Sequence, residues 1–190
     1  MPPILCDYND HPPIKDVVFV VEETSSLNGH FEDLITNYLV QTLEFFNEGP
    51  HTTVERSWAS VECTNTFSLV CFRTADCRPR LMTRAQGPYT SAKVFFNALE
   101  SIQFSGGLGE TKSCGSDGLA DALRIFNQLD KRRDSYLKPG HPVSKFIVYI
   151  ANSAPFEMPV QDVVDYIGQS IEDLIKKISE KKIFFNVIGT

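Results

Sequence analysis

The run DVVFVVE, residues 16–22, decides the fold of this chain. It is too short for a helix, and its apolar, β-branched residues leave neither face polar, which is typical of a strand buried in the middle of a parallel sheet. Further strands are predicted at TFSLVCFRT (66–74), at SKFIVYIANS (144–153) and at IFFNVI (183–188), with a short one near residues 81–84.

Amphipathic helices are predicted between these strands. Apolar residues recur at helical spacing from Phe31 to Phe46, where Asn47-Glu48-Gly49-Pro50 ends the helix, and again over residues 94–102. Ser116 is predicted to cap a helix that fades at the charged residues 131–134, and Ser170-Ile171-Glu172-Asp173 resembles a capping box. The alternation predicts an α/β fold: a doubly wound, mostly parallel central sheet flanked by helices on both faces.

Composition narrows the possible functions. The chain has 190 residues, of which 42% are hydrophobic and 22% charged. This proportion of apolar to charged residues is typical of one globular domain. Its net charge of -6, with no basic run longer than residues 131–133, argues against direct binding to nucleic acid or to an anionic membrane. Five cysteines without a C-x-x-C pair favour a reduced, intracellular compartment.

The stretch GGLGETKS, residues 106–113, nearly matches a phosphate-binding loop. Thr111 stands where that motif has its second glycine, and the stretch follows a predicted helix, whereas a phosphate loop leaves a strand and opens a helix. The sequence also has no G-x-S-x-G nucleophile motif. We therefore expect no enzymatic activity, and a nucleotide-binding enzyme remains one alternative.

Side chains with oxygen atoms follow two of the predicted strands. The first strand ends in Glu22-Glu23-Thr24-Ser25-Ser26, the strand ending at Ile150 runs into Ala151-Asn152-Ser153, and GGLGET lies between them in sequence. Open α/β sheets bind their ligands at the carboxyl ends of the strands. We therefore expect these three loops to converge on one point.

These segments resemble a known family. DVVFVVEETSSL is similar to the opening strand of von Willebrand factor type A domains, whose metal-ion-dependent adhesion site carries D-x-S-x-S there. The combination of TADC-x-P, FSGGLGE and NSAP resembles more specifically the von Willebrand A family found at the N-terminus of Mediator complex subunit 25. The resemblance implies a lead-in over residues 1–15 and a Rossmann-like von Willebrand A domain over residues 16–190, without its final helix.

Carried over to this chain, the metal site is degenerate. Glu22 replaces an aspartate, and its extra methylene displaces the carboxylate by about 1.5 Å. Gly109 falls where the family has a threonine, so it offers no side-chain oxygen, and Asn152 replaces a distal aspartate. Mg²⁺ requires near-ideal octahedral geometry. The resemblance therefore implies that the changed rim is a poor magnesium site.

Thr24 and Ser26 keep the hydroxyls of the pattern, and they could instead satisfy backbone groups at the turn. Thr111 or Glu110 could compensate for Gly109 if the loop bends differently. We expect no tightly bound metal and no other cofactor, and weak Mg²⁺ binding stays open.

The family implies a function in the nucleus. It predicts a non-enzymatic protein-interaction domain of a transcriptional coactivator, which anchors its subunit to other Mediator subunits and so acts indirectly on the RNA polymerase II machinery. Trp58, in an irregular loop at residues 51–64, is a candidate contact, because aromatic residues are favoured at interfaces. The alternative is a Mg²⁺-dependent, adhesion-type ligand-binding domain.

Overall fold

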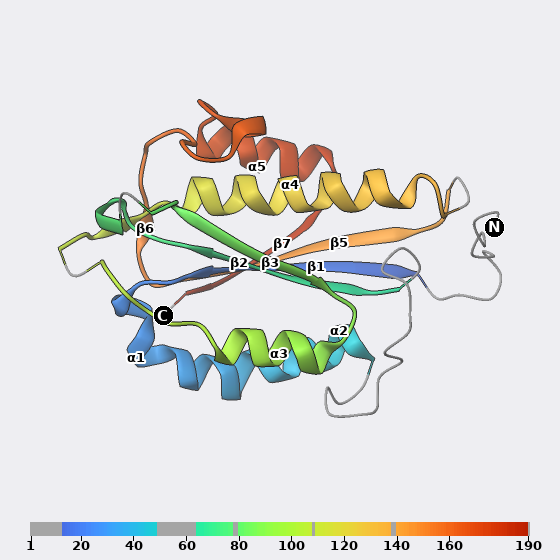
Figure 1. Ribbon diagram of the computed structural model, residues 1–190, viewed down its shortest axis with the longest axis horizontal. Helices are drawn as coiled ribbons and strands as arrows, with labels where there is room; N and C mark the ends of the chain where they lie inside the picture. The colour runs from blue at the N-terminus through green and yellow to red at the C-terminus, as the bar shows by residue number, and fades with distance from the viewer. Residues whose placement is uncertain (1–12, 49–63, 78–79, 108, 138–139, 190) are drawn as a thin grey trace.

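The computed structural model describes residues 13–48, 64–77, 80–107, 109–137 and 140–189, in which a central sheet lies between two layers of helices (Figure 1). The sheet has five strands in the order β3-β2-β1-β5-β7. They are β1 (Ile14–Glu22), β2 (Thr66–Phe72), β3 (Thr83–Tyr89), β5 (Val143–Ala151) and β7 (Phe184–Gly189). All neighbouring pairs are parallel except β2 with β3. The predicted fold class is confirmed.

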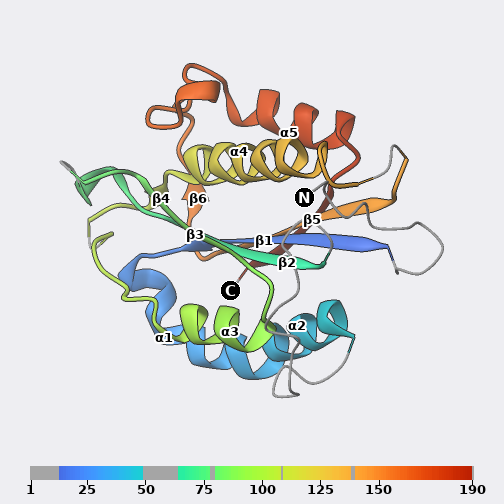
Figure 2. The ribbon, with the colours of Figure 1, turned by 45° about the vertical axis from the view of Figure 1, so that its right-hand side comes forward.

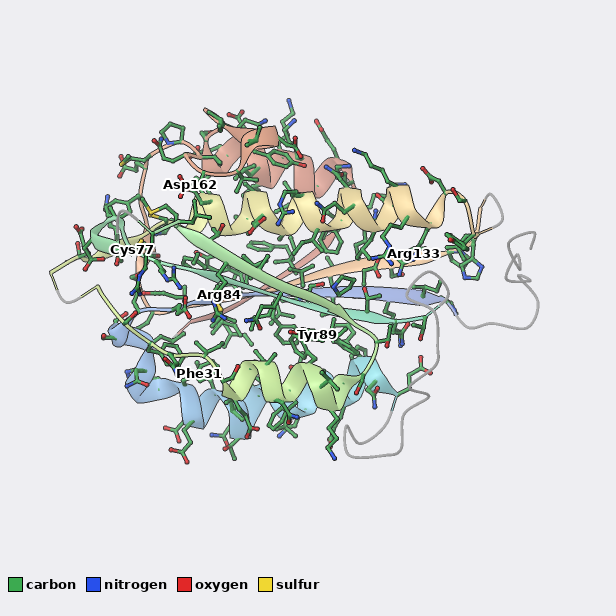
Figure 3. All side chains as sticks on the ribbon, viewed as in Figure 1. Phe31, Cys77, Arg84, Tyr89, Arg133 and Asp162 are labelled. Carbon is green, nitrogen blue, oxygen red and sulfur yellow. The ribbon has the colours of Figure 1, made fainter. Side chains whose placement is uncertain are left out.

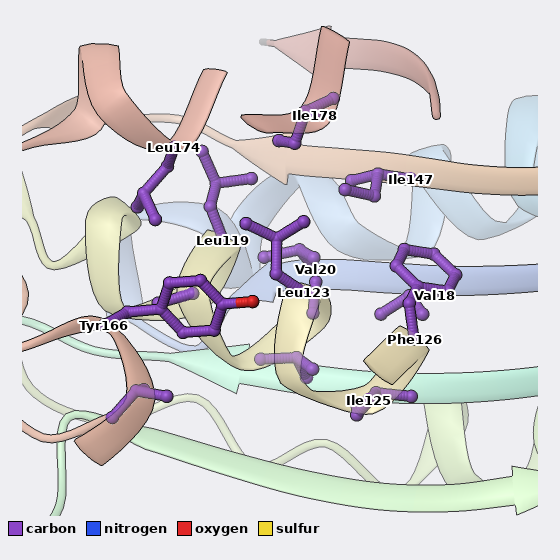
Figure 4. Packing of buried hydrophobic residues seen from close by; sticks show 14 of the residues in the cluster. Val18, Val20, Leu119, Leu123, Ile125, Phe126, Ile147, Tyr166, Leu174 and Ile178 are labelled. Carbon is purple, nitrogen blue, oxygen red and sulfur yellow. The ribbon is translucent and has the colours of Figure 1, made fainter. Parts of the chain in front are cut away.

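Two hydrophobic cores bury opposite faces of β1. Val18 and Val20 pack in the core under α4 and α5 (Figure 4), whereas Phe19 and Val21 pack in the core over α1, α2 and α3. Figure 2 shows the two helical layers on either side of the sheet. The helices are α1 (Ser25–Leu34), α2 (Val40–Asn47), α3 (Ala92–Glu100), α4 (Gly115–Arg133) and α5 (Ile171–Glu180). Burial on both faces explains why β1 lacks polar alternation.

The first helical region begins earlier than predicted. α1 starts at Ser25, soon after the end of β1. The residues around Leu27 are weak helix formers, but burial of Leu27 in the core stabilises the helix there. A π-helical turn, Ile35–Leu39, then joins α1 to α2 and shifts the phase of the apolar residues, so that Tyr38 is exposed. The predicted end is confirmed: α2 stops at Asn47, and Glu48 adopts the left-handed conformation with φ of 59°.

Two other local predictions need correction. β3 is antiparallel and extends well beyond the predicted residues 81–84. Ser116 lies inside α4, whose N-cap is Cys114, and its Oγ instead donates to the carbonyl of Met158 at 3.2 Å. The capping box at α5 is confirmed, because the side chains of Ser170 and Asp173 each accept from the other's backbone N–H.

A buried ion pair fixes the amino end of β1. Arg133, in the last turn of α4, forms a bidentate pair with Asp16 through both of its terminal nitrogens. Thr66 of β2 also donates its hydroxyl to Asp16 at 2.7 Å. Asp16 is 0% exposed and Arg133 4% exposed, so the ion pair is buried. α4 ends at Arg133 with Asp134 as its C-cap, so its predicted end at the charged residues 131–134 is confirmed.

β7, the strand at one edge of the sheet, carries exposed apolar side chains. Phe184 and Val187 are more than half exposed, as is Phe45 on α2. A groove between α2 and β7 includes Phe45 and Ile188 in its lining. The domain therefore presents aromatic surface at this edge of the sheet.

Candidate functional site

The carboxylate of Glu22 is the centre of the candidate site, at the carboxyl end of β1. Its side chain is 0% exposed. One oxygen, Oε1, accepts the hydroxyl of Thr24 at 2.5 Å, that of Ser26 at 3.0 Å and that of Ser153 at 2.8 Å. Thr24 and Ser26 also lie within hydrogen-bond distance of each other, at 2.7 Å. The E-x-T-x-S pattern thus folds back on its own glutamate.

The second oxygen of Glu22 is held by the loop after β5. Oε2 accepts the backbone N–H of Asn152 at 2.8 Å and that of Ser153 at 3.0 Å. The Asn152 side chain turns to the other loop, where its amide donates to the carbonyl of Ser26 at 3.0 Å. The two strand ends are therefore joined through one carboxylate, and Asn152 takes part with both its backbone N–H and its side-chain amide N–H as donors.

These contacts set the ionisation of Glu22. Burial raises its pKa, but the hydrogen bonds from Thr24, Asn152 and Ser153 together outweigh burial, and the net pKa lies below the ordinary value of 4.5. The group is therefore a carboxylate at neutral pH. A cation could bind it only by displacing hydroxyl donors or by meeting backbone N–H groups, whose positive ends point at Oε2.

The Gly-Gly pair of the third loop lies against Thr24, as the sequence predicted. Gly106 and Gly107 have φ of 76° and 75°, and a Cβ on Gly107 would approach the Cβ of Thr24 to 3.0 Å. The carbonyl of Gly106 accepts the N–H of Ser25 at 3.1 Å. Glycine is therefore required here by backbone conformation and by close packing.

The rest of that loop turns away from Glu22. Gly109 is exposed, and a Cβ built on it would meet nothing within 4 Å. Thr111 is exposed too and leads into β4 (Lys112–Ser113), which pairs with β6 (Ala154–Pro155). The predicted convergence therefore holds for Glu22, Thr24, Ser26, Asn152 and the Gly-Gly pair, and not for Gly109 and Thr111.

Sequence reasoning missed Ser153 and Asp76. Ser153 supplies both a hydroxyl and an N–H to Glu22, and its only signal is its place beside Asn152 after a strand. Asp76 accepts the hydroxyl of Thr74 and, at 3.0 Å, the N–H of Gly107, so it holds the Gly-Gly loop from the side of β2. Asp76 belongs to the TADC motif, which indicated the family but not a role for this residue in the site.

Glu23 points away from Glu22 and meets cations. Its carboxylate lies 2.7 Å from Nη2 of Arg73 and 2.7 Å from Nη2 of Arg84. Because successive residues at a strand end face opposite sides, two adjacent glutamates have different partners. Trp58, the predicted contact residue, lies outside the described residues.

The described residues contain no cluster of three or more histidine, cysteine or acidic side chains placed to hold a metal ion. None of the helices in this part of the chain has the length and apolarity needed to cross a bilayer. The GGLGET segment follows α3, as predicted, rather than a strand, which weighs against a phosphate loop.

A mostly parallel sheet with helices on both faces and an oxygen-rich rim at its carboxyl edge is consistent with a von Willebrand A type of α/β domain. Solved structures of similar fold include proximal thread matrix protein 1 from the mussel byssus, with a TM-score of 0.52 and 16% identity over 93% of this chain and 36% of that one. The pilus adhesin SpaC from Lactobacillus rhamnosus GG, in its open conformation, gives a TM-score of 0.53 and 13% identity over 95% of this chain and 24% of that one. At such identity these likenesses concern the fold alone.

The family follows from the sequence comparisons. Residues 11–190 match the model of the Mediator complex subunit 25 von Willebrand factor type A family, and the chain belongs to that family. Over 93% of its length it is 37% identical to Mediator of RNA polymerase II transcription subunit 25 from Xenopus tropicalis and 35% identical to the Homo sapiens protein. The chain spans 21% and 23% of those two relatives.

Proposed function

We propose that this chain is a protein-interaction domain that anchors a Mediator subunit within the Mediator complex, in the nucleus, without catalysing a reaction. Membership of the subunit 25 family supports a role in RNA polymerase II transcription. Other Mediator subunits are the proposed partners, and the polymerase machinery is reached through them. Exposed aromatic residues such as Phe45 and Phe184 support contact with protein rather than with a small ligand.

The state of Glu22 is the observation that carries the metal-free part of this proposal. In an adhesion-type site the rim carboxylate would share a divalent cation with the bound ligand. Here three hydroxyls and two backbone N–H groups already occupy the two oxygens of Glu22. Mg²⁺ would have to break several of these bonds and still lose its own hydration. We propose that the rim is a structural joint between β1 and β5 and that no metal takes part in anchoring.

Recovery of Mediator subunits from nuclear extract, with the tagged domain as bait, tests the proposal. The extract is divided between buffer with EDTA and buffer with millimolar Mg²⁺, and the wild-type domain is compared with Glu22→Gln. We expect the same subunits in both buffers and with both proteins, because the contact needs neither the cation nor the charge of Glu22.

Circular dichroism first confirms that each bait is folded. A folded wild-type domain that recovers no Mediator subunit would overturn the proposal. Recovery that requires Mg²⁺ and disappears in Glu22→Gln would instead support the adhesion-type alternative. Isothermal titration with Mg²⁺ and Mn²⁺ separates these cases independently, since the proposal expects no saturable heat.

A further inference from the structure

Three sulfur atoms meet beside the sheet, outside the Glu22 rim. Cys77 ends a short 3₁₀ helix (Ala75–Cys77), Met82 directly precedes β3, and Cys114 caps α4. The Sδ of Met82 lies 3.8 Å from the Sγ of Cys77 and 3.5 Å from the Sγ of Cys114. Both cysteines are thiols rather than halves of a disulfide. Two thiols and a thioether therefore come together from three separate elements.

Backbone hydrogen bonds hold these elements together without a ligand. The N–H of Arg73 donates to the carbonyl of Met82 at 2.9 Å, and the carbonyl of Arg73 accepts the N–H of Cys114 at 2.8 Å. The N–H of Met82 donates to Asp162 at 2.7 Å. Figure 3 shows Cys77 and Asp162 at the same end of the molecule. The sulfur atoms are thus positioned by the fold itself.

We propose that Cys77, Met82 and Cys114 form a binding site for a monovalent copper ion. Thiolate and thioether sulfurs are soft donors that select Cu(I). In a trigonal site with metal–sulfur bonds of about 2.3 Å, the sulfurs stand about 4.0 Å apart, that length times the square root of three. The separations of the Met82 sulfur from the two thiols are close to this edge. Zn²⁺ fits less well, since its structural sites take four nitrogen, oxygen or thiolate ligands.

Access also suits a cation. Cys77 is partly exposed, whereas Met82 is 3% and Cys114 7% exposed, so an ion enters past Cys77 and is then shielded from water. Because thiolates are the ligands, copper displaces protons from the two thiols when it binds.

Anaerobic titration with Cu(I) against a chromophoric chelator tests the proposal in the full chain. Cys6 and Cys63 are first replaced by serine, so that the stoichiometry reports on described cysteines only. We expect one equivalent of copper to bind and the melting temperature to rise with copper concentration. Met82→Leu keeps the side-chain volume and the fold, and we expect it to weaken copper binding at least tenfold.

Cys71→Ala is the matched control, because Cys71 is a buried cysteine of β2 that lies outside the cluster. It should bind copper as the parent does, while Cys77→Ser and Cys114→Ser should lose the tight equivalent. X-ray absorption of the loaded protein should show three sulfur ligands. The proposal is overturned if Met82→Leu binds as tightly as the parent, or if the folded parent binds no more tightly than a variant that also carries both Cys77→Ser and Cys114→Ser.

Discussion

The two ends of β1 each bury a carboxylate, and the two are stabilised differently. Asp16 and Glu22 are both 0% exposed. Asp16 meets the guanidinium of Arg133, which carries a full positive charge, and one hydroxyl. Glu22 meets three hydroxyls and two backbone N–H groups, which carry only dipoles. One end is neutralised as an ion pair, and the other is solvated by the protein.

The difference separates two kinds of joint between distant segments. At Asp16 the strand is joined to the end of α4, and neither partner can be removed without leaving a buried charge. At Glu22 the strand is joined to the loop after β5 by many weaker bonds, so the loss of one donor leaves the others in place. We therefore expect mutations at the Asp16 end to act strongly and together, and those at the Glu22 end to act gradually and with a pH dependence.

Arg133→Met should have the largest effect of the changes considered. It keeps much of the side-chain volume but leaves Asp16 buried without its cation, which should destabilise the domain by about 3–5 kcal/mol. Urea denaturation at neutral pH measures the change. The double variant Asp16→Asn with Arg133→Met should recover part of this loss, since the uncompensated charge is gone. Equal losses in the single and double variants would show that packing, not charge, is what Arg133 contributes.

The sequence predicted the structural features that depend only on residues close together in the chain. β1 followed from an apolar run, and the capping box at Ser170 from four residues. Glu22 followed from its place at the end of that run, and the resemblance to a known family added the expectation that the rim is a degenerate metal site. The burial of Arg133 had no local signal, because in sequence it belongs to a charged run and its partner lies 117 positions away.

The same limit applies within the candidate site. Glu22, Thr24 and Ser26 could be predicted because they lie within five residues of one another. Ser153 could not, because whether its hydroxyl reaches Glu22 depends on the register of β1 with β5, which pairs Val21 with Ile150. The π-helical turn at Ile35–Leu39 was missed for a similar reason, since tertiary packing overrides the helical period there.

Glu22→Gln should have an intermediate effect and remove a pH dependence. Its amide nitrogen would face donors that now point at a carboxylate, so we expect a loss of about 1.5–3 kcal/mol at neutral pH. The folded pKa of Glu22 is below 4.5, so its stabilising contribution is complete above the unfolded pKa. It is lost as pH falls through the folded pKa. Urea titrations from neutral to acidic pH should therefore show the wild type and Glu22→Gln converging, and a constant difference would contradict the assignment.

Ser153→Ala should have the smallest effect and should show how evenly the donors of Glu22 share the charge. The change removes one hydroxyl but keeps the backbone N–H of residue 153, so we expect a loss of about 0.5–1.5 kcal/mol. Because that hydroxyl helps to lower the pKa of Glu22, its removal should raise the folded pKa and move the acid-sensitive range to higher pH. Urea denaturation across pH measures both changes, with Ser91→Ala as a control that weakens a distant helix cap, because the Ser91 hydroxyl accepts the backbone N–H of Val94 and not a bond from an acid. If Ser153→Ala is as damaging as Glu22→Gln, the hydroxyls do not act independently, and the Glu22 end is as cooperative as the ion pair at Asp16.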